Sequence, residues 1–171
     1  MLRYVISKRL DSAERELGAS VDYLRHILRV SVKSFFKFAK VLSMANCRRQ
    51  LPMNAFHVGL LVATRDEDCG TCVQIGVNMA KKDGVPNEVL RAVVEKRPDD
   101  LPDDLADVYR FAEAVVTANG QDGPWRDRIL ERFGEQGLVD LAIGMAACRV
   151  FPITKRAMGY AKSCSQVHIE I

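Results

Sequence analysis

The spacing of apolar residues constrains the fold of this chain more than any other feature. Apolar side chains recur three and four positions apart along most of the sequence, which is typical of helices that bury one face. Proline and glycine residues interrupt this pattern at intervals, and we place helix ends there. The sequence therefore predicts an all-α fold, a compact bundle of about six to nine helices.

The expected helices lie between these interruptions. A helix begins after Ser20, Pro52 stands at the first position of another, and Gly84 ends a third. Pro152 is expected to kink or break the last long helix near residue 149, with a further turn or two to Ala161. The expected helical ranges are 21–30, 32–46, 52–66, 69–82, 86–94, 103–118, 125–133 and 138–149.

The two ends of the chain favour strands instead. Tyr4, Val5 and Ile6 are of the type found in strands, and the tail at 167–171 alternates apolar and polar residues. We expect residues 2–6 to pair with this tail in a small two-stranded patch.

One domain is expected over residues 1–171, made of an N-terminal extension at 1–19, a helical core at 20–165 and a tail at 166–171. A chain of 171 residues is long enough to bury a core of its own. Its 48% hydrophobic and 27% charged residues are ordinary for a folded protein.

The charge and the N-terminal sequence limit the expected partners. The net charge is +3, and Lys and Arg are spread along the chain, so we expect no nucleic-acid partner. The first residues lack the apolar centre of a secretory signal, and the apolar runs fall short of the ~20 residues of a membrane helix. We therefore expect a cytoplasmic protein with no membrane partner.

Five cysteines are present, at positions 47, 69, 72, 148 and 164. An odd count without a secretory signal does not indicate a disulfide framework. Cys47 and Cys148 lie in apolar helical surroundings and are expected to be inert. Cys69 and Cys72 differ, because they lie three positions apart at the start of the expected helix 69–82 and can meet on one face.

This placement favours thiol chemistry. Unpaired backbone N–H groups and the positive end of the helix dipole stabilise a thiolate at a helix start, which lowers the pKa of the cysteine. The neighbouring Asp66, Glu67 and Asp68 oppose this effect, since nearby carboxylates disfavour a further negative charge. We expect the helix start to dominate if these carboxylates point to solvent.

Two other interpretations of the thiol pair stay open. Cys69 and Cys72 could be buried cysteines without chemistry, or two ligands of a zinc site completed by Cys47 and His57. Structural zinc sites usually have a second close pair of ligands, and the sequence has none. A thioredoxin fold would need strands around the pair, which the pattern does not predict. We therefore expect neither a metal nor an organic cofactor.

The thiol stretch also resembles a known family. From about His57 to Leu90, the sequence VGLLVATRDEDCGTCVQIGVNMAKKDGVPNEVL resembles the core of the alkylhydroperoxidase D / carboxymuconolactone decarboxylase superfamily, peroxidase-related branch. VYRFAEAVV and LVDLAIGMAACRV resemble its downstream helices, so the resemblance covers about residues 20–165. It implies an all-α fold built around a helical hairpin.

The resemblance also implies roles for individual residues. Peroxidase members carry a Glu, Cys-x-x-Cys twelve positions later, and a His four positions after the second Cys. Cys72 then matches the cysteine that attacks the peroxide and Cys69 the resolving cysteine, but Gly76 stands at the family's His position and His57 at its Glu position. We hypothesise that the His57 ring fills the space left at Gly76 and accepts the proton of Cys72. The alternative is that His57 is an ordinary core histidine and Gly76 a packing contact.

The expected function is that of a thiol-dependent peroxidase or disulfide oxidoreductase. Its partners would be a hydroperoxide substrate and an external dithiol reductant. The resemblance further implies a homo-oligomer, and the aromatic helix with Phe35, Phe36 and Phe38 is expected to form part of the buried or shared surface. The alternatives are a redox-responsive or non-catalytic helical module, and a decarboxylase-like enzyme for a small cyclic acid, for which Cys-x-x-Cys is not needed.

Overall fold

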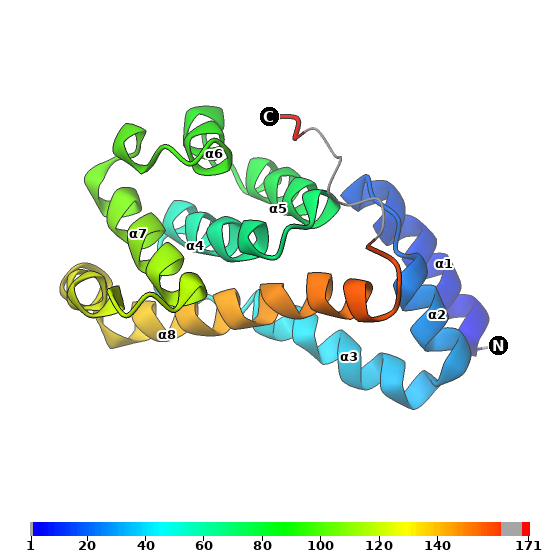
Figure 1. Ribbon diagram of the computed structural model, residues 1–171. Helices are drawn as coiled ribbons and strands as arrows, with labels where there is room; N and C mark the ends of the chain where they lie inside the picture. The colour runs from blue at the N-terminus through cyan, green and yellow to red at the C-terminus, as the bar shows by residue number, and fades with distance from the viewer. Residues whose placement is uncertain (1, 162–168) are drawn as a thin grey trace.

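The computed structural model describes residues 2–161 and 169–171. These residues form eight α-helices, one short 3-10 helix and no strand, which confirms the predicted all-α bundle (Figure 1). The helices are α1 (Leu2–Leu17), α2 (Asp22–Val30), α3 (Val32–Ala45), α4 (Met53–Asp66), α5 (Gly70–Lys82), α6 (Asn87–Val94), α7 (Asp103–Thr117) and α8 (Asp122–Ala157), with the 3-10 helix at Pro98–Asp100.

Helix ends follow the local chemistry that the sequence indicates. Pro52 and Pro86 directly precede α4 and α6, where a residue without an N–H costs no helical hydrogen bond. Ser31 caps α3, since its side chain accepts a hydrogen bond from the Ser34 N–H at 3.1 Å. Gly84, with φ +84°, turns the chain after α5 in a conformation that favours glycine.

The expected two-stranded patch is wrong. Residues 2–6 belong to α1, and residues 169–171 are not in a strand; positions 167 and 168 lie outside the described residues. The physical reason is burial: Ile6 and Leu10, four positions apart, are the buried residues of α1, while Tyr4 and Val5 are exposed. One buried helical face outweighs the local strand preference of these residues.

Helix α8 breaks between the expected helices 125–133 and 138–149, as predicted, but not at Pro152. Gly134 has φ +68° and ψ −178°, which divides α8 into the segments 122–133 and 135–157. Pro152 lies inside the second segment and does not end it. By length and composition alone, α8 is the one helix in the described chain that is apolar enough to cross a membrane, and core helices of soluble proteins have the same character.

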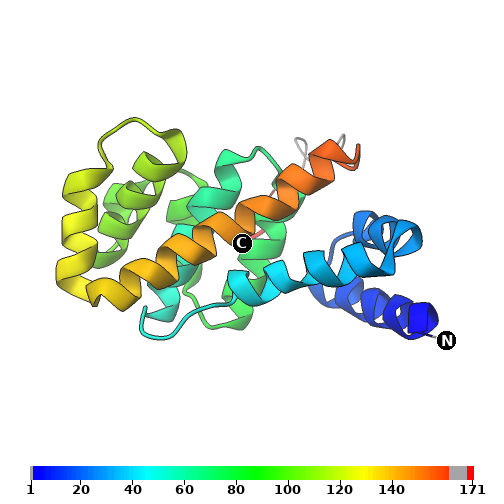
Figure 2. The same ribbon diagram turned by 90° about the horizontal axis from the view of Figure 1, so that it is seen from below.

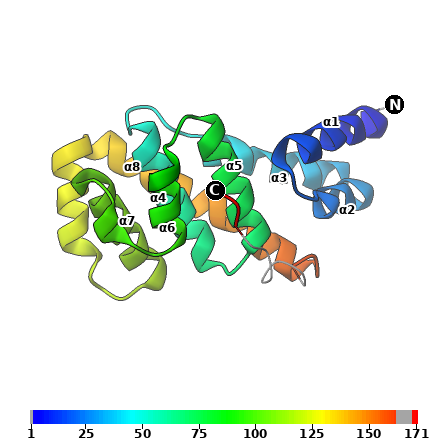
Figure 3. The same ribbon diagram turned by 90° about the horizontal axis from the view of Figure 1, so that it is seen from above.

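The helices are arranged around α4 and α8. Helices α4 and α5 form a hairpin, and α4 packs against α7 and α8 (Figure 1). Helices α1 and α2 lie at one end of the molecule, and α7 with the first segment of α8 lies at the other (Figures 2 and 3). Helix α3 connects the two parts because it runs from α2 back along α8.

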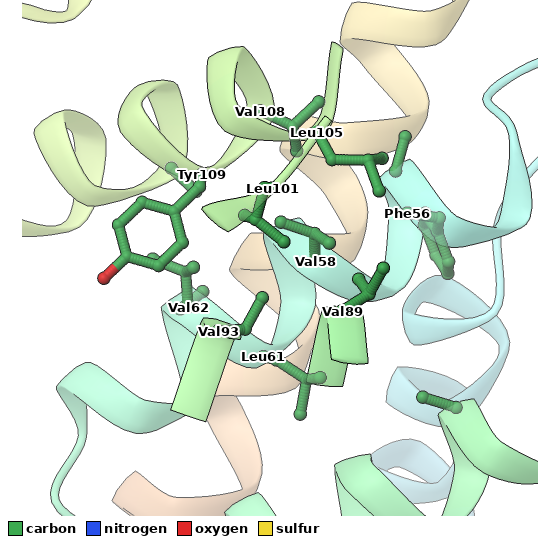
Figure 4. Packing of buried hydrophobic residues seen from close by; sticks show 14 of the residues in the cluster. Phe56, Val58, Leu61, Val62, Val89, Val93, Leu101, Leu105, Val108 and Tyr109 are labelled. Carbon is green, nitrogen blue, oxygen red and sulfur yellow. The ribbon is translucent and has the colours of Figure 1, made fainter. Parts of the chain in front are cut away.

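Apolar side chains are buried in two main clusters. The larger joins α4, α5, α6, α7 and α8, and Figure 4 shows its centre, where Val58 and Val62 of α4 meet side chains of α6 and α7. The smaller joins Ile6, Leu10, Val21, Leu28 and Phe35 of the first three helices and their connections.

Small residues let α4 and α8 approach closely. A Cβ atom at Gly144 would lie 2.7 Å from Phe56 Cε2, and a Cβ atom at Gly59 would lie 2.2 Å from Leu141 Cδ1. Both distances are shorter than atoms tolerate, so an alanine at either position would force the neighbouring side chain to move.

Candidate functional site

The two thiols of the Cys-x-x-Cys motif lie together at the start of α5. Cys69 immediately precedes the helix and Cys72 is its third residue. Their Sγ atoms are 2.7 Å apart, and the two residues are only 1% and 8% exposed. The chain reaches this position through Asp68, whose φ of +48° turns it from α4 into α5. The pair is therefore close enough to form a disulfide with little movement.

The acidic residues before the pair are held by arginines of α8. Nε of Arg149 lies 2.6 Å from Oε1 of Glu67, and its Nη2 lies 3.2 Å from Oδ2 of Asp66. Arg156 also pairs with the Glu67 carboxylate, at 3.5 Å, and donates to its backbone carbonyl. Glu67 is buried rather than directed to solvent. Its negative charge would oppose a thiolate nearby, and the two guanidinium groups offset that charge.

A cavity of about 480 Å³ lies beside the thiol pair. It is bounded by α1, α2 and α3 on one side and by α4, α5 and α8 on the other, between the two parts of the molecule that Figure 2 shows. Cys72 lines it, and most of the other lining residues are apolar, among them Leu24, Phe38, Leu60 and Phe151. A group that enters this cavity meets Cys72 rather than Cys69.

Tyr23 lies near both the thiol pair and Lys155. Burial raises the pKa of the Tyr23 hydroxyl well above its usual value, and charge on Cys72 and Cys69 raises it further, which indicates that the thiols are nearby. Nζ of Lys155 lies 6.0 Å from the centre of the Tyr23 ring. Tyr23 and Lys155 both line the cavity and both are buried.

The structure pairs the His57 ring with Asp83. Nε2 of His57 lies 2.8 Å from Oδ2 of Asp83, the residue that ends α5. Asp83 follows Cys72 by eleven residues, which corresponds to roughly 16 Å along a helix. His57 and Cys72 both line the cavity, and the His57 ring pairs with Asp83 at the far end of α5 from Cys72.

The space beside Gly76 is also filled differently from the hypothesis. A Cβ atom at Gly76 would lie 2.8 Å from Cδ2 of Leu61, so a leucine of α4 packs there instead of the His57 ring. The geometric form of the proton-relay hypothesis is corrected by these two contacts: His57 pairs with Asp83, and Leu61 covers Gly76.

The remaining candidates add no second site. Burial raises the pKa of the Cys148 thiol to about 11, and its Sγ contacts the carbonyls of Leu60 and Met145. Over the described ranges, no three His, Cys, Asp or Glu side chains gather as metal ligands, so the zinc alternative with Cys47 and His57 has no site there. Cys164 lies outside these ranges.

The signals for Tyr23, Lys155, Arg149 and Arg156 are weak in the sequence. Each lies on a helix with ordinary polar and apolar spacing, and only the packing of α2 and α8 on the α4–α5 hairpin brings them together.

No known relative identifies the chain. No protein-family model matches it, and no curated protein or solved structure does. The resemblance to the alkylhydroperoxidase D / carboxymuconolactone decarboxylase superfamily therefore stays a prediction from the residues.

Proposed function

We propose that this chain is a thiol-dependent peroxidase, a disulfide oxidoreductase that uses Cys72 and Cys69. The observation that carries the proposal is the 2.7 Å separation of the two Sγ atoms at a helix start, with Cys72 on the wall of a cavity of about 480 Å³. A nucleophilic thiol with a resolving thiol in reach and space for a substrate is what such a reaction needs.

The reaction uses two cysteines and one peroxide. The Cys72 thiolate attacks the terminal oxygen of the hydroperoxide, the O–O bond breaks, and the alkoxide leaves as an alcohol after taking up a proton. Cys72 is then a sulfenic acid. Cys69 attacks the Cys72 sulfur, water leaves, and a disulfide forms. An external dithiol reduces this disulfide by two thiol–disulfide exchanges and is itself oxidised.

The surroundings of the pair support a thiolate without help from His57. Cys72 lies in the first turn of α5, where the backbone N–H groups carry partial positive charge. Arg149 and Arg156 offset the charge of Glu67, the nearest buried carboxylate in the preceding turn. We assign His57 no direct role in proton transfer with Cys72.

The proposed assembly is a homo-oligomer in the cytoplasm. Large apolar residues are exposed on α1 and α3, and Phe36 of the aromatic helix is 47% exposed, whereas Phe35 is buried. Phe38 packs edge to face against Tyr23 and Phe151. Only Phe36 of the three aromatic residues therefore favours a shared surface.

A redox-responsive module is the second candidate. The observation that favours it is the filled space at Gly76 together with the distant His57, because the family's proton relay has no counterpart there. Such a module would form the same disulfide without rapid turnover. A decarboxylase-like activity on a small cyclic acid is the third, and it would survive loss of both cysteines.

A pH titration of Cys72 alkylation in the reduced protein tests the proposal, followed by peroxide challenge and mass spectrometry. We expect an apparent pKa below the ordinary ~8.5 of a cysteine and a Cys69–Cys72 disulfide after peroxide. Cys72→Ser is the control for the modified site, and Cys69→Ser should accumulate the sulfenic acid. An ordinary pKa without disulfide formation would exclude the peroxidase, and slow formation without turnover by a dithiol would favour the redox-responsive module.

A further inference from the structure

Lys155 is a buried cation without a counter-ion. Its residue is only 6% exposed and it lines the cavity. Across the part of the chain that the structure describes, its Nζ forms no hydrogen bond and no ion pair. The Nζ atom faces the Tyr23 ring, whose centre lies 6.0 Å away. Arg149 and Arg156, on the same helix, are both paired with carboxylates.

The other basic side chains of the cavity wall are already engaged. Nη1 of Arg48 donates to the carbonyl oxygen of Leu51 at 2.8 Å, and Nε2 of His57 lies against Asp83. Arg48 is only half-buried and can be hydrated, whereas Lys155 is buried, so Lys155 is the basic residue of this wall whose charge lacks both a carboxylate partner and full contact with water. An ammonium group in apolar surroundings is costly unless a negative charge or water compensates it.

The cavity around Lys155 has the character of a site for an apolar molecule. Its volume of about 480 Å³ falls within the ~300–1,000 Å³ of small-molecule sites. The walls contain side chains of six helices and are mostly aliphatic and aromatic. A buried lysine without a carboxylate partner in such a wall matches a ligand with one negative charge at the end of an apolar chain.

We propose that this cavity binds a carboxylic acid with an apolar chain, whose carboxylate pairs with Lys155 and whose chain lies against α3 and α4. The chain would contact Phe38 and Leu42 of α3 and Leu60 of α4. This binding does not require thiol chemistry, and so it goes beyond the proposed peroxidase function.

Calorimetric titration with laurate, and with dodecanol as the uncharged ligand of equal chain length, tests the proposal. Lys155→Met removes the charge at similar size, Lys155→Arg retains it, and Lys81→Met removes the charge of an exposed lysine on α5. Thermal unfolding of each variant shows whether it is folded. Cys69→Ser, which removes a thiol that the reaction needs and that does not line the cavity, is titrated in parallel, because unchanged laurate binding there separates this proposal from the thiol reaction.

The expected result is a Kd for laurate that is weaker by about tenfold or more in Lys155→Met. Lys155→Arg and Lys81→Met should retain laurate binding, and dodecanol should bind the wild-type protein and Lys155→Met alike. Equal loss of both ligands in a folded Lys155→Met would overturn the role of the carboxylate. Absence of laurate binding to the wild-type protein would overturn the site itself.

Discussion

Arg149 of α8 and Glu67 of the turn before α5 are joined by a contact of 2.6 Å between Nε and Oε1, 82 residues apart in the chain. Glu67 is buried, so this pair and the contact with Arg156 compensate a charge that would otherwise lie next to the thiols without neutralisation. The helix that carries the arginines thereby sets the electrostatics of the turn that positions Cys69.

Replacing Arg149 by methionine should affect both stability and thiol reactivity. Glu67 would keep its buried charge with only the more distant Arg156 to compensate it, so we expect the free energy of unfolding to fall by about 2 kcal/mol. The same charge should raise the apparent pKa of Cys72, measured as the pH dependence of alkylation. Urea unfolding gives the stability.

The double variant Arg149→Met with Glu67→Gln is the control for this prediction. It removes the uncompensated charge, so the pKa of Cys72 should return toward its wild-type value. A single variant with wild-type alkylation at every pH would show that the Glu67 charge does not reach the thiol pair.

His57 should prove structural rather than catalytic. Because its ring pairs with Asp83 at the end of α5, His57→Ala should lower the free energy of unfolding by about 1–3 kcal/mol, through the lost contact and the space it leaves. The pH dependence of Cys72 alkylation should not change. Asp83→Asn is the matched control, and a shift of the Cys72 profile in His57→Ala alone would restore the relay hypothesis.

The sequence contains enough information for most of the fold. Apolar spacing and the Pro and Gly residues at helix ends predict the helices from α2 to α8, since these are local properties. The start of α1 is missed because Tyr4, Val5 and Ile6 have strand propensity, and only burial of Ile6 in the assembled protein favours the helix. The break of α8 at Gly134 falls in the predicted gap between 125–133 and 138–149, whereas the continuation of the last helix through Pro152 to Ala157 is not predicted.

The site is predictable only in its local part. The proximity of Cys69 and Cys72 follows from their spacing at a helix start. The partners of His57 and Glu67 do not, because they depend on how far one helix is shifted and rotated against another. The position of α4 along α5 decides which residue of that helix His57 meets, and Leu61 fills the space at Gly76.

Asp140 should make the stability of the fold depend on acid. It is buried and accepts hydrogen bonds from the N–H groups of the 49–51 segment, which connects α3 to α4. Burial would raise the pKa of its carboxyl, but these hydrogen bonds and one from Gln136 lower it to about 2 from the ordinary 3.8. The folded protein therefore binds this proton less readily than the unfolded chain.

A carboxyl whose pKa is lower in the folded protein stabilises the fold fully at any pH above its pKa in the unfolded chain. This stabilisation is lost as the pH falls from about 4 toward 2. We expect Asp140→Asn to lower the free energy of unfolding by about 2 kcal/mol at neutral pH, and the difference from wild type to shrink over that range. Asp127→Asn, at an exposed position of α8, should have little effect. A difference between Asp140→Asn and wild type that stays constant down to pH 2 would contradict this assignment.

Gly59 should be required for the contact of α4 with α8. A Cβ atom there would lie 2.2 Å from Cδ1 of Leu141, which is fully buried and has little room to move, so Gly59→Ala should lower the free energy of unfolding by about 1–3 kcal/mol. Gly123→Ala is the matched control, because nothing lies within 4 Å of its Cβ position and alanine favours a helix. Gly59→Ala should lower the free energy of unfolding less in a Leu141→Ala background than in the wild-type protein, because the added methyl group then has space. Equal stability of Gly59→Ala and Gly123→Ala in urea unfolding would mean that the two helices lie farther apart than the structure places them.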